Sequence, residues 1–333
     1  MNYSNTLQTD LIKIIKKSQN IIITSHTNPD GDAIGSMLAV HHYCNLLGIN
    51  SQCIIVDNVP KNLQFLNGAE KIEVYNKQRH KQLFSKSDLI VLVDLNDIAR
   101  VRDMEVPIKE SKAYKIVIDH HINPKDFADY YFVNNNIAAT GELIWQLFMS
   151  DPDFKLNRNI AEALYAAIVT DTGNFHYPRT TAKTHNIISQ LIEAGADPTE
   201  LYEKIYNQSS FNVIKLLGIA LSNLKLLYNG RVCLMPLSSV DFRNTHTSFR
   251  DTEFFVERTL SIEGVSVGIL ITEVLEKGQF KVSLRSKEDY NVASIAQFIG
   301  GGGHINAAGA TFQSSDLNSA IETIIRLIGK LFE

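Results

Sequence analysis

The chain has few cysteines, and none of them is paired in the sequence. Cys44, Cys53 and Cys233 are scattered along 333 residues, and no CxxC motif occurs. A disulfide framework or a thiolate zinc site needs paired or closely spaced cysteines, so neither is indicated. We expect buried, reduced thiols.

Long uncharged stretches are also missing. The N-terminal segment MNYSNTLQTDLIKIIKK has no apolar core of signal-peptide length. No later stretch approaches the roughly 20 apolar residues of a membrane span. The sequence therefore predicts a cytoplasmic protein with no membrane partner.

Positive charge is scarce as well. Lys and Arg number 32 against 36 Asp and Glu, so the formal net charge is −4. Proteins that grip a long phosphate backbone depend on many Lys and Arg contacts. The balance argues against long nucleic acid as a partner and is compatible with a short nucleotide. Apolar residues at 44% and charged residues at 20% are ordinary for a globular enzyme.

The length suits two domains. Four apolar runs in the first half, 20–24, 52–56, 89–93 and 115–118, predict strands, and helical spacing at 33–47 and 141–149 alternates with them. This alternation predicts an α/β fold with a parallel, doubly wound sheet in an N-terminal domain, residues 1–185.

The second half has a different pattern. A helix at 159–170 leads to Asp171, and residues 184–228 are mostly helical with no clear strand. Strands are then predicted at 232–235, 265–274 and 280–284, with Gly278 in a turn. We expect a helical connector at 186–228, a smaller α/β domain at 229–333, and a cleft between the domains.

Polar residues follow three of the predicted strands. They are His26 to Asp32, then Asp94, then Asp119, His120 and His121. Ligands bind at the carboxyl ends of strands in open parallel sheets, so these groups should converge. Viewed alone, the DGD sequence at 30–32 is also typical of a capped turn. Asp94 could likewise cap the element that follows it, and Asp171 could be a carboxylate at a helix end.

Three ionisable groups after a buried strand are costly to desolvate unless a metal or partners satisfy them. The set contains imidazole and carboxylate but no sulfur, which favours Mn²⁺, or Mg²⁺ or Co²⁺, over structural zinc. It supplies enough ligands for two ions about 3.5 to 4 Å apart, the separation used to hydrolyse phosphate esters. The candidate ligands are His26, Asp30, Asp32, Asp94, His120 and Asp171.

A second group lies in the C-terminal domain, where Arg285 and Ser286 end a strand. An Arg fork matches phosphate oxygens, and N–H groups in a glycine-rich loop can bind an anion. Viewed alone, the glycines could form a hinge and the arginine could be a surface residue. The loop residues are Gly301, Gly302, Gly303 and His304.

These motifs resemble the DHH phosphoesterases over nearly the whole chain. The N-terminal motifs occur in order as HTNPDGD at 26–32, VLVD at 91–94, DHH at 119–121 and TDTGNF at 170–175. The C-terminal half resembles the family's associated domain through SLRS at 283–286 and GGGGH at 300–304. The length and these motifs are most similar to bacterial nanoRNases, which hydrolyse very short RNA and the 3′-phosphate of adenosine 3′,5′-bisphosphate.

The resemblance implies roles for individual residues. One Mn²⁺ would be held by His26, Asp30 and Asp94, and the other by Asp32, Asp94, His120 and Asp171. Asp119 would orient His120, His121 would face the scissile phosphate, and Asp94 would bridge the ions. Ile305 and Asn306 stand where some relatives carry a basic residue, which leaves the substrate preference open.

The expected partners are short single-stranded RNA oligomers and small nucleotides, and a homodimer is compatible with the family. A linear or cyclic dinucleotide phosphodiesterase is the nearest alternative. A pyrophosphatase or exopolyphosphatase, and a non-catalytic nucleotide-binding regulator, are less favoured. The regulator is disfavoured because a degenerate sensor usually loses ligands and this ligand set is complete.

Overall fold

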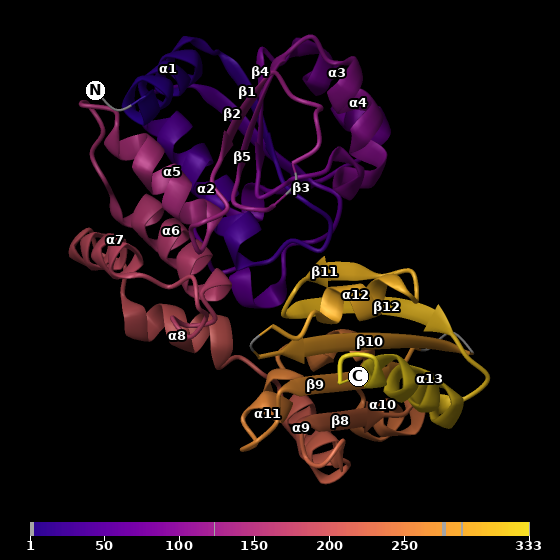
Figure 1. Ribbon diagram of the computed structural model, residues 1–333. Coiled ribbons are helices and arrows are strands. Elements are labelled where there is room, and N and C mark those ends of the chain that lie inside the picture. The colour runs from indigo at the N-terminus through magenta and orange to yellow at the C-terminus, as the bar shows by residue number, and fades with distance from the viewer. Residues whose placement is uncertain (1–2, 123, 275–277, 288, 333) are drawn as a thin grey trace. The chain divides into compact units, whose positions relative to one another are not determined.

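A computed structural model describes residues 3–122, 124–274, 278–287 and 289–332, without the side chains of 3–7 and 304. The chain divides into two compact units, Met1–Gln208 and Ser209–Glu333 (Figure 1). The stretch expected to be a connector, 186–228, is shared between these units.

The first unit contains a sheet of six parallel strands in the order β3-β2-β1-β4-β5-β6. Its central strand β4 reads LIVLV and is buried at every position, as expected where helices cover both faces of a sheet. The predicted doubly wound fold is therefore confirmed. The strands are β1 (Asn20–Thr24), β2 (Asn50–Ile55), β3 (Glu73–Val74), β4 (Leu89–Val93), β5 (Tyr114–Asp119) and β6 (Tyr130–Val133).

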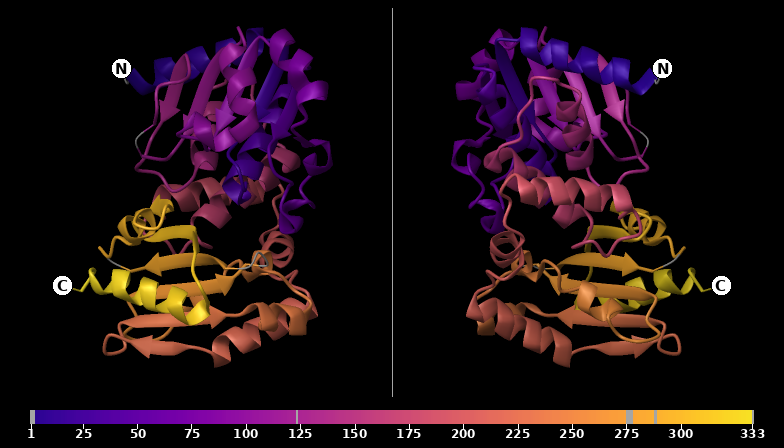
Figure 2. Two further views of the ribbon diagram at one scale, coloured as in Figure 1. Left: turned by 90° about the vertical axis from the view of Figure 1, so that its right-hand side faces the viewer. Right: turned by 90° about the vertical axis from the view of Figure 1, so that its left-hand side faces the viewer.

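Helices pack against both faces of this sheet (Figure 2). Successive side chains of a strand point to opposite faces. Ile21 and Ile23 accordingly join the core under α2, α5 and α6, whereas Ile22 joins the core with Phe84 of α3 and Ile108 of α4. The helices are α1 (Tyr3–Lys17), α2 (Gly31–Leu46), α3 (Lys77–Lys86), α4 (Glu105–Glu110), α5 (Thr140–Met149), α6 (Arg158–Asp171), α7 (Ala182–Glu193) and α8 (Pro198–Tyr206).

Helices α2 and α6 approach each other closely because α2 carries glycine at the contact. A Cβ at Gly35 would lie 2.3 Å from the Ala163 carbonyl oxygen, and one at Gly31 would lie 2.3 Å from Thr170 Oγ1. The start of α2 is thereby held against the end of α6. This contact brings the loop before α2 close to Asp171.

The second unit has its own six-stranded sheet, in the order β11-β12-β10-β9-β8-β7. All neighbours are antiparallel except β8 and β9. Its strands are β7 (Lys225–Leu227), β8 (Val232–Leu237), β9 (Val267–Glu273), β10 (Gln279–Ser286), β11 (Gly302–His304) and β12 (Ala307–Gln313), and its helices are α9 (Phe211–Ser222), α10 (Ser239–Thr245), α11 (Glu257–Leu260), α12 (Val292–Gln297) and α13 (Leu317–Gly329).

One expectation for this region was wrong. No strand was predicted within the expected connector, 186–228, yet Lys225–Leu227 forms β7. The segment has no alternating pattern of its own, and it becomes a strand by pairing with β8 at the sheet edge. Gly278 lies in the predicted turn, with φ of 81°.

The sequence analysis also predicted that the cysteines are buried and that the chain has no membrane-spanning segment. Cys44, Cys53 and Cys233 are all buried, as expected. Within the described part of the chain, no helix combines the length and apolar character needed to cross a bilayer.

Candidate functional site

The candidate site is built at the carboxyl edge of the first sheet. His26 follows β1, Asp94 follows β4, and Asp119 ends β5 with His120 directly after it. Strands β1 and β4 are neighbours at the point where the chain order of the sheet reverses direction. Such a reversal leaves a crevice beyond the strand ends, which is where ligands bind in this class of sheet.

One group of ligand atoms surrounds His26. Its Nδ1 lies 2.8 Å from the Thr27 carbonyl oxygen and therefore donates, while Nε2 lies 3.1 Å from Asp94 Oδ2 and 3.9 Å from Asp30 Oδ2. An unprotonated Nε2 and a carboxylate oxygen at that separation repel each other unless a proton or cation lies between them. Burial disfavours the imidazolium, but Asp94 outweighs it and raises the pKa of His26.

A second group surrounds His120. Its Nε2 lies 3.2 Å from Asp171 Oδ2, 3.6 Å from Asp94 Oδ1 and 3.9 Å from Asp32 Oδ2. Asp94 thus directs Oδ2 to His26 and Oδ1 to His120. Three triads each have ligand atoms within 4.8 Å of one another: His26–Asp30–Asp94, Asp32–His120–Asp171 and Asp94–His120–His121. The structure therefore brings together all six predicted ligands.

Negative charge is crowded at this point. Burial, followed by the charges of Asp94 and Asp171, raises the pKa of Asp32 well above its usual value. Burial and the charges of Asp30 and Asp94 do the same for Asp171. Burial alone would raise the pKa of Asp94, but its contacts with His26, His121 and His120 have the larger effect and lower it. Buried carboxylates in excess of nearby cations, with only oxygen and nitrogen donors, fit divalent metal ions.

The backbone at Asp94 is in the left-handed region, with φ of 55°. Its N–H donates to the Ile118 carbonyl oxygen at 2.9 Å, which ties the turn to β5. Left-handed conformations cost non-glycine residues free energy and persist where surrounding contacts hold them. The turn aims the Asp94 carboxylate between the two histidines.

The other carboxylates are anchored by helix starts. Asp32 accepts from the N–H groups of Thr140 and Gly141, at 2.6 and 2.9 Å, in the first turn of α5. Asp30 Oδ1 accepts from Ala33 N at 3.0 Å and caps α2, while its Oδ2 faces His26. Asp30 therefore caps a helix and also lies within the candidate metal site, which were the two alternatives that the sequence left open. Nothing in the sequence around 140–141 indicated a contact with Asp32.

One expected contact is wrong. Asp119 was expected to orient His120, but its Oδ1 lies 2.7 Å from Nδ1 of His121. Residues two apart point to the same side of an extended chain, so Asp119 and His121 meet whereas His120 turns the other way. Among the described residues, Asp119 Oδ2 is buried and has no hydrogen-bond partner.

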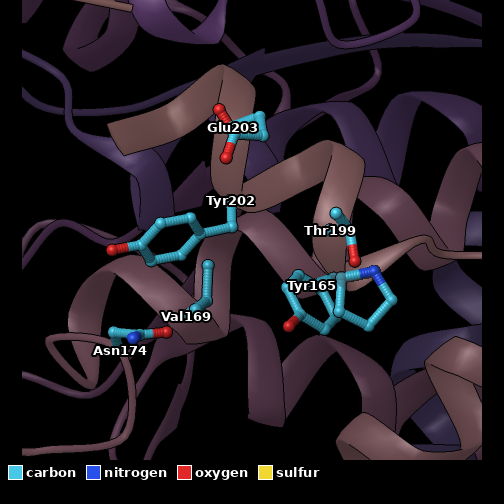
Figure 3. Close-up of a pocket in the computed structure, with 7 residues that line it drawn as sticks. Tyr165, Val169, Asn174, Thr199, Tyr202 and Glu203 are labelled. Carbon is cyan, nitrogen blue, oxygen red and sulfur yellow. The ribbon is translucent and has the colours of Figure 1, made fainter. Parts of the chain in front are cut away.

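Two features beside the site were not anticipated. The positive charge of Arg100 opposes the increase in the pKa of His26 and of His121 that their carboxylate partners cause. A hollow of about 330 Å³ is lined by residues of α6 and α8 and by Asn174 (Figure 3). Tyr165, Asn174 and Tyr202 line it, and none of the candidate metal ligands does.

Two of the predicted phosphate-binding residues of the second unit, Arg285 and Ser286, contact other residues of their own unit. Arg285 Nε donates to Glu257 Oε1 at 3.0 Å, whereas Ser286 lies on the opposite face of β10 and donates to the Tyr290 carbonyl oxygen at 2.6 Å. The Gly301 N–H donates to the Ala296 carbonyl oxygen and is thus occupied.

The glycines permit close packing of β11 on β12. A Cβ at Gly301 would lie 2.2 Å from the Gly309 carbonyl oxygen, and one at Gly303 would lie 2.3 Å from that of Ala307. Gly302 pairs with Gly309 in the sheet. The side chain of His304 is not among those that the structure describes, so its predicted role stays a prediction.

Comparison with known proteins agrees with these two units. The N-terminal domain of the DHH family matches residues 20–168, and the DHHA1 domain matches residues 242–330. Bifunctional oligoribonuclease and PAP phosphatase NrnA of Bacillus subtilis is 28% identical over 314 residues, covering 93% of this chain and 95% of that protein. Cyclic-di-AMP phosphodiesterase PdeA of Listeria monocytogenes is 26% identical over 329 residues, covering 96% of this chain and 48% of that longer protein.

A solved structure is similar along its whole length. The crystal structure of an exopolyphosphatase-related protein from Bacteroides fragilis superposes with a TM-score of 0.94 at 30% identity and covers 98% of both chains. The chain therefore belongs to the DHH family of phosphoesterases and is a hydrolase in which a DHH N-terminal domain precedes a DHHA1 domain.

Proposed function

We propose that the protein is a two-metal phosphoesterase that hydrolyses very short oligoribonucleotides to mononucleotides and removes the 3′-phosphate of adenosine 3′,5′-bisphosphate. The observation that carries this proposal is Asp94, whose two oxygens point to two separate groups of nitrogen and oxygen ligands. A shared carboxylate is how a protein holds two ions at the spacing needed for displacement at phosphorus.

The distances support the ligand sets that the family resemblance implies. His26, Asp30 and Asp94 would hold one divalent ion, and Asp32, Asp94, His120 and Asp171 the other, with Mn²⁺ suited to this mixture and Mg²⁺ or Co²⁺ alternatives. When bound, such ions supply Lewis acidity at the scissile phosphate. Asp32 is kept in position by α5, so its carboxylate needs little rearrangement to bind.

His121 has a different role in this proposal. The hydrogen bond from its Nδ1 to Asp119 orients the ring, which directs Nε2 toward the substrate. Burial lowers the pKa of His121, but Asp119 and Asp94 prevail, and the net effect is an increase. The imidazolium is thereby favoured, and it would contact the scissile phosphate and stabilise the charge that develops there.

The test is product release by the purified protein in Mn²⁺. Adenosine 3′,5′-bisphosphate, a short RNA oligomer, a cyclic dinucleotide and pyrophosphate are compared at equal concentration. We expect turnover of the first two. Preferred turnover of pyrophosphate or the cyclic dinucleotide would leave the metal chemistry in place and overturn the substrate assignment.

A dinucleotide phosphodiesterase is the second candidate, because similarity to PdeA also extends over nearly all of this chain. Both activities use the same ligand sets. The panel separates them where the alternative substrate is a cyclic dinucleotide, and a linear dinucleotide added to the panel tests the other form of this alternative.

A further inference from the structure

The first turn of α5 contacts the carboxylate that lies between the two ligand groups. The hydroxyl of Thr140 donates to Asp94 Oδ1 at 3.2 Å, and Thr140 is fully buried. Asp94 Oδ1 is the oxygen that faces His120. A carboxylate oxygen has two lone pairs, so it can accept this hydrogen bond and still face a cation. The hydroxyl therefore fixes the direction of Asp94 Oδ1 without blocking it.

The backbone of the same turn holds a second carboxylate. The Thr140 N–H donates to Asp32 Oδ2 at 2.6 Å, and the Gly141 N–H donates to Asp32 Oδ1 at 2.9 Å. Unpaired N–H groups at the start of a helix favour a negative charge beside them. Thr140 thus contacts both Asp32 and Asp94, two candidate ligands that lie on separate segments of the chain.

Gly141 lets this turn approach the helix that ends in Asp171. A Cβ at Gly141 would lie 2.8 Å from Ala167 Cβ and 3.6 Å from Asp32 Oδ1. The first distance is shorter than two carbon atoms tolerate, so any larger residue would push α5 away from α6. Because α6 ends at Asp171, the turn lies where three segments that carry candidate ligands meet.

Glu142 connects the same turn to α7. Its buried carboxylate accepts from the Thr184 hydroxyl at 2.8 Å, in the first turn of α7. Hydrogen bonds to a buried carboxylate are among the stronger contacts within a protein. The turn is therefore held in place independently of the candidate ligands, and it can in turn hold them.

We propose that Thr140 is a positioning residue that keeps Asp94 and Asp32 in the relative orientation needed to bind one divalent ion. The proposal rests on the two-metal function proposed above, from which it takes the identity of the ligands. The N–H groups of the turn act on Asp32, whereas the hydroxyl of Thr140 acts on the bridging carboxylate. Loss of the hydroxyl should therefore affect the ion beside His120 more than the ion beside His26.

The first test is Mn²⁺ binding by the full-length protein, measured by isothermal titration and by electron paramagnetic resonance. Thr140→Val removes the hydroxyl and keeps the size of the side chain. We expect it to weaken the binding of one ion by roughly 10- to 100-fold, the usual effect of losing a group that orients a ligand. The other ion should bind nearly as before, and the resonance signal of a coupled pair should weaken at equal Mn²⁺ concentration.

Thr259→Val is the matched control. Thr259 is equally buried, but it lies in the second unit and its hydroxyl donates to the Val256 carbonyl oxygen at 2.6 Å. This variant should bind both ions as the wild type does. Unchanged Mn²⁺ affinities in a Thr140→Val protein that is folded by circular dichroism would refute the positioning role.

Thr140→Ser and Thr140→Ala give a second comparison, which also applies if Thr140→Val does not fold. The two variants differ from each other by the hydroxyl alone. We expect Thr140→Ser to bind Mn²⁺ nearly as the wild type does and Thr140→Ala to bind one ion more weakly. Equal affinities in these two variants would overturn the proposal, because the hydroxyl would then have no effect.

The last test is kinetic and uses adenosine 3′,5′-bisphosphate over a range of Mn²⁺ concentrations. In folded Thr140→Val, kcat should fall at low Mn²⁺ and recover as Mn²⁺ is raised, with little change in KM for the nucleotide. A loss of kcat that no Mn²⁺ concentration restores, with unchanged Mn²⁺ affinity, would contradict the positioning role. Two bound ions and an intact contrast between the variants, without hydrolysis of either proposed substrate, would refute the proposed function alone.

Discussion

At the scale of single residues, Asp94 would be the carboxylate that bridges the two ions of the proposed mechanism. Its carboxylate reaches both ligand groups from a turn in which the backbone is left-handed. Asparagine tolerates that backbone better than most residues, so Asp94→Asn removes the charge with little strain.

We expect Asp94→Asn to lose bound divalent metal and more than about 100-fold in turnover, since even changes beyond the direct ligands cost up to about that much. Metal content by mass spectrometry and initial rates in Mn²⁺ provide the measurement. Asp151→Asn is the control, because Asp151 is equally buried but pairs with Lys16 and Tyr43. Full metal content in Asp94→Asn would exclude a bridging role.

Asp119→Asn tests a residue that acts through another. The amide keeps the size of the carboxylate but weakens the hydrogen bond that orients His121. We expect kcat to fall by roughly 10- to 100-fold while metal content stays at the wild-type level. Metal loss in this variant would instead place Asp119 among the ligands.

At the scale of elements, the contact between α2 and α6 sets the position of Asp171 relative to Asp30 and Asp32. Gly35→Ala would force a methyl group against the Ala163 carbonyl oxygen. We expect a loss of about 1–3 kcal/mol in the free energy of unfolding and a loss of activity. Urea unfolding followed by fluorescence of Trp145 measures the first unit, which contains this single tryptophan.

Gly218→Ala provides the comparison, because a Cβ there has no atom within 4 Å. Gly218 lies in the second unit, so both variants are also followed by circular dichroism, which reports the helices of both units. Alanine in that exposed helix should be neutral or stabilising by up to about 1 kcal/mol. Equal losses in the two variants would mean that helix contact is not the cause.

Helix α2 also makes the first unit sensitive to acid. Burial, followed by the charges of His42 and Lys71, lowers the pKa of His41 from 6.5 to about 4. The unfolded chain then takes up a proton between these values while the folded protein does not, so the free energy of unfolding should fall as the pH drops from about 6.5 toward 4. His41→Gln should flatten this dependence in urea unfolding between about pH 7 and pH 5. His185→Gln, at an exposed position, should leave it unchanged.

Elements could be predicted from the sequence where their own residues determine them. Strands β1, β4 and β5 are continuous apolar runs, and each was anticipated within a residue or so. The edge strands β3, β6, β7 and β11 were not. They are short, and a strand such as Glu73–Val74 acquires its structure only by pairing with a neighbour.

The candidate site could likewise be predicted from the sequence only in part. His26, Asp94 and His120 follow strands, so their convergence is a consequence of the topology of the sheet. Asp171 ends α6 and reaches the site through the contact of that helix with α2. The pairing of Asp119 with His121 and the opposite faces of Arg285 and Ser286 follow from the alternation of side chains along an extended chain, which the assignment of roles by motif did not take into account.

At the scale of the whole molecule, the net charge of −4 limits how much nucleic acid can be held. With two or three phosphate contacts at about −0.7 each, the logarithm of kcat/KM should fall against the logarithm of salt with a slope of about −1.4 to −2. The measurement uses a dinucleotide, a pentanucleotide and a long unstructured RNA. We expect rates to decline with length, and internal cleavage of the long RNA at comparable rates would contradict this expectation.

Asp32 has a consequence for folding as well as for chemistry. Its carboxylate joins the start of α2 to the first turn of α5 and lies beside His120 and Asp171. Any ligand that binds the folded state alone stabilises it in proportion to the logarithm of its concentration. The corner where these helices meet should therefore open more often when metal is chelated, so that metal supply would govern how long the protein survives proteases as well as how fast it works.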